Sequence, residues 1–161
     1  MKLTHIKDGE PPRLVCAVCG FIFYLDPKVA ACVIIEIENK IVLLKRAIEP
    51  SLGKWVIPGG YVDVGEPVTE AALRETWEEV RLRVAIGPLV GVYSYPEATA
   101  IVVVYKAFVQ DGRMAPGDET LEVRLFALAD IPWNQIAFKS TRDALQDYLR
   151  THHPEAPPEP R

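Results

Sequence analysis

The sequence predicts a mixed α/β protein of one domain, and three observations lead to this prediction. Short runs of β-branched and apolar residues recur along the chain, and turn-forming residues separate them. Two other segments carry apolar residues at spacings of three and four, which indicates amphipathic helices. Hairpins and long connections outnumber regular strand–helix–strand units, so we do not expect a doubly wound nucleotide-binding fold. The length of 161 residues suits one domain of ordinary size.

The predicted elements follow one another between residues 29 and 150. Residues 29–37 and 41–45 indicate a hairpin with a turn at 38–40, and residues 55–57 form a short strand that ends at Pro58-Gly59-Gly60. Pro67 suits the first turn of a helix that continues to about residue 80. Residues 84–93, 100–109 and 122–128 predict further strands, and residues 141–149 predict a second helix.

The two ends of the chain differ in composition from this domain. Residues 1–28 are rich in turn formers and contain Cys16-x-x-Cys19, so we expect an N-terminal extension that carries a small knuckle. We expect the knuckle to pack Phe21, Phe23 and Tyr24 against the domain. Residues 151–161 contain four prolines and almost nothing apolar, which predicts a disordered tail.

Composition excludes several classes of protein. Hydrophobic residues make up 49% and charged residues 25%, which is typical of a globular domain that needs no disulfide scaffold. The net charge of -4 argues against a dedicated nucleic-acid binder and gives no reason to expect a membrane partner. The longest apolar run is far shorter than a membrane span, no signal peptide is visible, and three cysteines do not make a secreted framework. We therefore expect a cytoplasmic protein.

The first predicted helix gathers three carboxylates. Its apolar stripe consists of Ala71, Ala72, Leu73, Thr76, Trp77 and Val80. On another face, Glu75 lies beside Glu78 and Glu79, because residues three and four apart are neighbours on a helix. A divalent cation such as Mg²⁺ or Mn²⁺ would remove the repulsion between these carboxylates, and the loop at Gly59 could add a carbonyl oxygen. Taken alone, three glutamates on one face also fit a merely solvated surface.

A wider pattern favours the metal site. The chain resembles the Nudix box, G-x5-E-x7-R-E-U-x-E-E-x-G-U, in which U is a large aliphatic residue. Six specified positions match at the fixed spacing: Gly60, Glu66, Arg74, Glu75, Glu78 and Glu79. Two positions depart from it, since Thr76 replaces an aliphatic residue and Arg81 replaces a glycine that would usually adopt positive φ after the helix. Neither departure removes a proposed metal ligand.

The resemblance implies an α/β/α sandwich around a mixed sheet and the hydrolysis of a nucleoside diphosphate linked to another group. It implies that Glu75, Glu78, Glu79 and the Gly59 carbonyl hold divalent cations. It also implies that Arg74 orients the glutamates while Glu66 braces the loop at Gly60. The alternative is a non-catalytic sensor of nucleotide ligands built on the same fold.

A catalytic base is expected either from the box or from a later acidic loop. In that loop we favour Glu122 and keep Glu119 as the second choice, while a solvated acidic turn is an equally good interpretation of either residue. Arg46 could reach a substrate phosphate, although a plain surface arginine would look the same. Four aromatic residues could stack on a base or flavin ring: Tyr24, Trp55, Tyr61 and Tyr93.

A narrower resemblance covers most of the chain. The runs VCAVCGFIFYLDPK, LLKRAIEPSLGKWVIPGGYVDVGE, ALRETWEE and ETLEVRLFALADIPWNQIAF look like a Nudix subgroup with an N-terminal zinc ribbon. Members of that subgroup cleave FAD, ADP-ribose or related ADP-containing compounds, so the implied partner is a small nucleotide, and a homodimer is possible. Cys16 and Cys19 are only one of the subgroup's two cysteine pairs, with His5 as a possible third ligand. Because a structural zinc site uses four ligands, we expect the knuckle to be without zinc.

Overall fold

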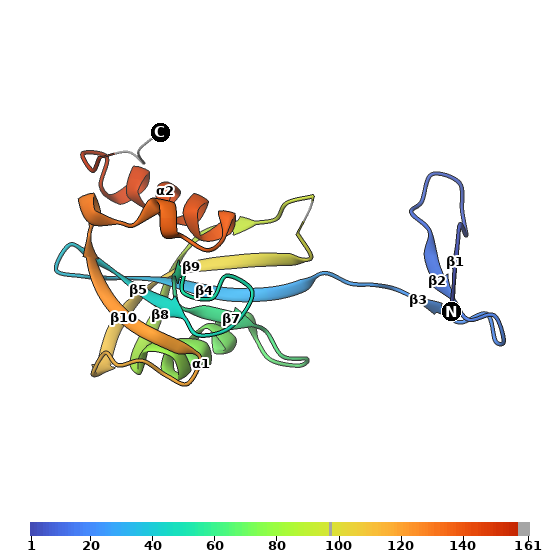
Figure 1. The fold of residues 1–161 in the computed structure, drawn as a ribbon, viewed down its shortest axis with the longest axis horizontal. Coiled ribbons are helices and arrows are strands. Elements are labelled where there is room, and N and C mark those ends of the chain that lie inside the picture. The colour runs from blue at the N-terminus through green and yellow to red at the C-terminus, as the bar shows by residue number, and fades with distance from the viewer. Residues whose placement is uncertain (97, 158–161) are drawn as a thin grey trace.

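The computed structural model describes residues 1–96 and 98–157, and a mixed β-sheet organises it (Figure 1). The strand order is β10-β5-β4-β9-β8, with β6 paired to β5 and β7 paired to β4. Strands β4 and β9 run parallel, and the other pairs in this sheet are antiparallel. The strands are β4 (Lys28–Ile37), β5 (Lys40–Arg46), β6 (Trp55–Val56), β7 (Gly59–Tyr61), β8 (Leu82–Tyr93), β9 (Ala100–Gly112) and β10 (Thr120–Ala127). The mixed sheet that the sequence predicts is therefore present.

Two helices cover the sheet on opposite faces. Helix α1 (Val68–Val80) lies against one face and α2 (Lys139–His152) against the other (Figure 1). Two short 3₁₀ turns, Leu128–Asp130 and Trp133–Gln135, connect β10 to α2. Alternate residues of β4 serve the two cores: Val33 and Ile35 pack with α1, and Ile34 packs with α2. This burial on both faces explains why residues 29–35 are almost entirely apolar, and it confirms the α/β/α sandwich.

Helix α1 confirms one expectation and corrects another. Thr76 is fully buried, and its hydroxyl donates to the carbonyl of Ala72 at 2.6 Å, so the polar residue is accommodated inside the packed face. Trp77 does not belong to the buried stripe, because it is 38% exposed and the Arg83 guanidinium lies 4.5 Å from its ring centroid. Glu79 takes the buried position instead, with only 9% of its surface exposed.

Arg81 occupies the left-handed region at the end of α1, with φ 59° and ψ 26°. The helix therefore ends in the way that the box glycine would end it, although a side chain is present. The backbone N–H of Arg81 donates to the Trp77 carbonyl at 3.1 Å, which closes the last turn of the helix. A non-glycine residue in this region carries a strain of about 1–2 kcal/mol.

We expect Arg81→Gly to stabilise the protein. Relative to Arg81→Ala, which also removes the side-chain contacts with Trp77, the glycine variant should gain about 1 kcal/mol in the free energy of unfolding. Urea denaturation of both variants measures the difference. Equal stability of the two variants would show that the left-handed conformation at residue 81 is not strained.

The N-terminal extension forms a small antiparallel sheet of its own. Its strands β1 (Lys2–Thr4), β2 (Arg13–Val15) and β3 (Ile22–Phe23) lie away from the main sheet, to which an extended segment joins them (Figure 1). At the knuckle, the N–H of Gly20 donates to the Cys16 carbonyl at 3.0 Å. The expected packing of this segment on the domain is wrong: Phe21, Phe23 and Tyr24 are 63%, 45% and 57% exposed.

The C-terminal segment is more ordered than the composition predicts up to residue 157. Helix α2 continues through His152, and the ring of His153 lies 3.0 Å from the Glu36 carboxylate, which also accepts the Tyr148 hydroxyl. Residues 158–161 of the predicted tail lie outside the described residues. No helix among the described residues is long and apolar enough to cross a membrane.

Candidate active site

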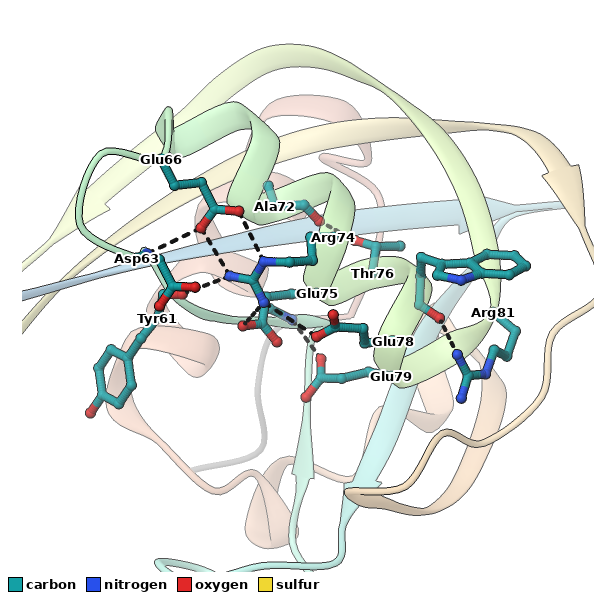
Figure 2. Close-up of polar contacts among 12 residues, drawn as sticks. Tyr61, Asp63, Glu66, Ala72, Arg74, Glu75, Thr76, Glu78, Glu79 and Arg81 are labelled. Atoms are coloured by element: carbon teal, nitrogen blue, oxygen red, sulfur yellow. Dashed lines mark hydrogen bonds and ion pairs between the residues drawn. The ribbon is translucent and has the colours of Figure 1, made fainter.

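Arg74 stands at the centre of a carboxylate network between the β7–α1 loop and helix α1 (Figure 2). Its Nε and Nη2 donate to the two oxygens of Glu66 at 2.9 and 3.0 Å, a bidentate pair. Its Nη2 also donates to the carbonyl of Tyr61 at 3.1 Å. Its Nη1 donates to Glu75 at 2.8 Å and to Glu78 at 3.2 Å. One guanidinium therefore links the loop to two of the three clustered glutamates.

Glu66 ties the loop to the helix from the other side. The Arg74 bond, together with the donated N–H of Asp63 at 3.1 Å, lowers the pKa of Glu66 to about 2. Across this network the pKa of Arg74 is raised, chiefly by its bond to Glu66. The pair is charged over the whole physiological pH range, so the loop is held at a fixed position relative to α1.

Glu79 is the most unusual ionisable group of the site. Its side chain lies beneath the loop, where its Oε2 accepts the N–H of Gly59 at 2.8 Å. Burial raises the pKa of Glu79 to about 8, and the nearby charges of Glu75 and Glu119 add to this rise, while Arg46 opposes it. Burial therefore disfavours the ionised form of Glu79 more than any neighbouring charge does.

Glu75 shares this environment. Burial raises its pKa, and the charges of Glu78 and Glu119 raise it further, although Arg74 opposes them. The loop residue opposite Glu75 is Gly60, and this contact explains why the sequence motif has a glycine there. A Cβ on Gly60 would lie 2.4 Å from the Glu75 carboxyl carbon, so only glycine lets the loop approach this carboxylate.

The donor set fits a hard divalent cation. Three carboxylates gather around one helix face, and two of them have raised pKa values that a bound cation would reverse. Within residues 1–96 and 98–157, no three His, Cys, Asp or Glu side chains are already grouped to hold a metal ion, at the glutamates or at the Cys16 knuckle. The hydrogen bonds explain this, because Glu75 and Glu78 turn toward Arg74 while Glu79 turns toward Gly59. At Gly59 it is the N–H, and not the carbonyl, that contacts a glutamate.

The loop between β9 and β10 docks on the end of α1. The N–H of Ala115 donates to the Val80 carbonyl at 3.1 Å, and the N–H of Gly117 donates to the Glu79 carbonyl at 3.0 Å. A Cβ on Gly117 would lie 1.7 Å from the Glu78 carbonyl oxygen, so no other residue fits this contact. The sequence analysis missed Gly117, because nothing in a loop sequence indicates which distant backbone it touches.

This docked loop separates the two candidates for a catalytic base. Glu119 follows Gly117 by two residues, and its charge raises the pKa of both Glu75 and Glu79. Its backbone carbonyl accepts the N–H of Ala47 at 2.9 Å, which fixes the loop on its other side. Glu122 instead forms an ion pair with Arg124 on β10. The geometry therefore favours Glu119 over Glu122.

A cavity of about 400 Å³ lies beside Gly59 and Gly60, the loop glycines that adjoin Glu79 and Glu75. Gly59, Gly60 and Tyr61 form one side of it, and Arg46 with residues 48–50 forms another. The start of α2 closes it through residues 138–141, and the floor is the α2-facing side of β4 and β9. Cys32 lies in this floor, and burial raises the pKa of its thiol to about 12. The cavity is large enough for a nucleotide and is mostly apolar, as small-molecule sites usually are.

Two predicted substrate contacts line this cavity. The guanidinium of Arg46 lies 5.1 Å from the ring centroid of Phe138, and its Nε donates to the carbonyl of Pro50 at 2.9 Å. Tyr61 is 51% exposed, and Lys28 Nζ lies 4.7 Å from its ring centroid. Each of the two pairs, Arg46 with Phe138 and Lys28 with Tyr61, therefore places a positive charge next to an aromatic ring. This arrangement suits an anionic ligand that carries a ring.

The other aromatic candidates lie elsewhere. Trp55 and Tyr93 are buried in the core beneath α2, where the Tyr93 hydroxyl donates to Asp147 at 3.0 Å, and Tyr24 belongs to the extension. The aromatic residues that the sequence analysis missed are Tyr95 and Phe138, which both line the cavity. Phe138 immediately precedes α2, a position that looks in the sequence like part of the helix core.

The chain is similar to known proteins over most of its length. A family model described as the NUDIX domain matches residues 26–147. An ADP-ribose pyrophosphatase of Methanocaldococcus jannaschii is 39% identical over 79% of this chain and 76% of that protein. A crystal structure of a NUDIX hydrolase from Nitrosomonas europaea, 42% identical, has a TM-score of 0.85 and aligns with 96% of this chain and 88% of that one. A putative 8-oxo-dGTP diphosphatase of Bacillus subtilis is 32% identical over 64% of this chain and 68% of that protein.

Proposed function

The chain belongs to the Nudix family of hydrolases, and from this premise we propose that it hydrolyses the diphosphate bond of an ADP-linked compound in the presence of Mg²⁺ or Mn²⁺. The observation that carries the proposal is the buried carboxyl of Glu79, with its pKa near 8, which accepts the N–H of Gly59, a residue that lines a nucleotide-sized cavity. Such a site attracts cations and lies where a diphosphate would be held.

ADP-ribose is the substrate that we propose first and FAD the second. The ADP-ribose pyrophosphatase named above is similar over three quarters of both chains, which supports ADP-ribose. The resemblance to the zinc-ribbon subgroup, which also implies FAD, stays a prediction, as do a cytoplasmic location and a homodimer. The similarity to a putative 8-oxo-dGTP diphosphatase makes nucleoside triphosphates a necessary comparison.

A substrate panel tests the proposal. The protein should be incubated with ADP-ribose, FAD, NADH and nucleoside triphosphates, each with Mg²⁺ or Mn²⁺, and the products separated. We expect AMP from ADP-ribose or FAD. No product from any substrate, with the protein folded, would reject the proposal. Tight binding without cleavage would favour the non-catalytic sensor instead.

The side chains would divide the work as follows. Glu75, Glu78 and Glu79 would hold the cations, which when bound neutralise the diphosphate and lower the pKa of a bound water. Arg74 would orient Glu75 and Glu78 through its two hydrogen bonds. Arg46 would contact a phosphate from the opposite wall, and Tyr61 would offer a ring face. A carboxylate is needed to take the proton of the attacking water.

We expect Glu119, and not Glu122, to be this carboxylate. Glu119→Gln should lower kcat by about 10²–10⁴-fold, the usual contribution of a general base. Glu122→Gln is the matched control, since it makes the same change three residues away on an ion-paired side chain, and it should keep near-normal kcat. Steady-state kinetics across pH measures both. The reverse ranking of the two variants would return the role to Glu122.

A further inference from the structure

Thr120, the first residue of β10, carries a buried hydroxyl without a partner in the protein. The residue is only 7% exposed, and within residues 1–96 and 98–157 nothing forms a hydrogen bond with its Oγ1. A hydroxyl that is removed from bulk water is normally bonded, because leaving it unpaired costs the bond that it made with water. The Thr120 hydroxyl therefore indicates a polar partner that comes from outside the polypeptide.

The register of β10 places the Thr120 side chain on the face of the sheet that α1 covers. Thr120 lies opposite Arg46, the last residue of β5, and Val123 lies opposite Leu44. Leu44 and Val123 both pack in the core beneath α1. Because side chains alternate along β5, Arg46 points to the same face as Leu44, and its partner Thr120 does too. The bulge after Thr120 absorbs the extra residue Leu121, which is 55% exposed.

The neighbours of Thr120 on this face belong to the carboxylate site. The Thr120 N–H donates to the Gly117 carbonyl at 3.1 Å, and the Gly117 N–H donates to the Glu79 carbonyl at 3.0 Å. Two successive hydrogen bonds therefore connect Thr120 to the end of α1. Burial raises the pKa of Glu79, the charge of Glu119 adds to this rise, and that of Arg46 opposes it. Because Glu119 precedes Thr120 and Arg46 lies opposite it, the unpaired hydroxyl lies among the groups whose charges act on Glu79.

We propose that the Thr120 hydroxyl is a further binding group of the carboxylate site, which accepts a hydrogen bond from a water of the hydrated divalent cation. This deepens the proposed function and rests on it in taking the cation to be Mg²⁺ or Mn²⁺. Mg²⁺ usually keeps several of its waters when carboxylates bind it. A hydroxyl accepts and donates at the same time, so it suits a place between such a water, which donates, and an ionised carboxylate, which accepts.

Binding of Mn²⁺ in the absence of substrate tests the proposal without any turnover. Thr120→Val removes the hydroxyl at nearly constant shape and should weaken Mn²⁺ binding about 10-fold, the lower end of the usual loss for a group that supports metal ligands. Thr120→Ser keeps the hydroxyl and should bind Mn²⁺ like the unchanged protein. Thr151→Val is the matched control, because that hydroxyl bonds the Asp147 carbonyl within α2. Electron paramagnetic resonance of free Mn²⁺ measures all four affinities, and equal values for Thr120→Val and Thr151→Val would overturn the proposal.

Stability and kinetics separate this role from a structural one. Because no described group loses a bond in Thr120→Val, its midpoint in urea without metal should match that of the unchanged protein. A clearly lower midpoint would show that the hydroxyl supports the fold, which would reject the proposal. With ADP-ribose, raising the Mn²⁺ concentration should restore the rate of Thr120→Val, and a loss that persists at saturating Mn²⁺ would contradict the role. The expected ranking of Mn²⁺ affinities without hydrolysis of any substrate would reject the proposed function and leave the role of Thr120 standing.

Discussion

Glu79→Gln is expected to lower turnover by about 10²–10³-fold, the range that follows the loss of one group that stabilises charge in a transition state. Glutamine keeps the size of the side chain and its bond with the Gly59 N–H, but it removes the charge that would hold a cation. Steady-state kinetics at several Mg²⁺ concentrations measures the change. Glu70→Gln makes the same substitution on an exposed first-turn position of α1 and should leave turnover unchanged.

In the absence of metal and at alkaline pH, the Glu79→Gln variant should also be more stable than the unchanged protein. The pKa of Glu79 is raised from 4.5 in an unfolded chain to about 8 in the folded protein. The folded state therefore retains a proton that the unfolded state has lost, so the stability is full below pH 4.5 and falls as the pH rises to about 8. The slope is about 1.4 kcal/mol per pH unit, which adds up to a few kcal/mol.

Glu79→Gln has no such group to ionise and should lose this part of the pH dependence. Urea denaturation with a chelator at pH 5 and pH 8.5 measures it, with Glu70→Gln again as the control. Added Mg²⁺ should restore stability to the unchanged protein at pH 8.5 and do less for the Glu79→Gln variant. Equal pH dependence of the two proteins would contradict the buried, proton-retaining carboxyl.

The sequence predicted the elements of the main sheet because their patterns are local. The apolar run at 29–35 is buried on both faces. The expected breaker at residues 58–60 is only partly one, because β6 ends at Val56 and a further strand, β7, begins at Gly59. Errors arose where a pattern allowed two faces. Trp77 continues the helical stripe in the sequence, yet the stripe rotates toward Glu79 because the loops around residues 59 and 117 cover that side.

The site could be predicted where one motif carries it and not where distant segments meet. Glu75, Glu78 and Glu79 are found together because they share one helix, and the network around Arg74 is the one that the motif implies. The choice between Glu119 and Glu122 depends on backbone contacts of a loop with α1, which leave no pattern in the sequence.

Gly117→Ala should impair the candidate active site, although Gly117 belongs to the loop that docks on α1 and not to the cluster of glutamates. The added methyl would lie 1.7 Å from the Glu78 carbonyl oxygen, so the loop must lift away and its bond with the Glu79 carbonyl must lengthen. The lost hydrogen bond and the crowding together should cost about 2–4 kcal/mol of unfolding free energy. Because Glu119 lies two residues further on, kcat should fall by about tenfold to a hundredfold, as expected for a catalytic group displaced by about 1 Å.

Gly87→Ala is the matched control for this variant. There the new methyl meets the Phe108 ring at 2.6 Å, on a side chain that is 50% exposed and free to move, and the Lys106 carbonyl only at 3.0 Å. Its kcat should stay near normal. The double variant Gly117→Ala with Glu119→Gln shows whether the effect passes through Glu119: if it does, the glycine change should add little to the loss caused by Glu119→Gln alone. Fully additive losses would show that Gly117 acts on the end of α1, and through it on Glu78 and Glu79, and not by positioning the base.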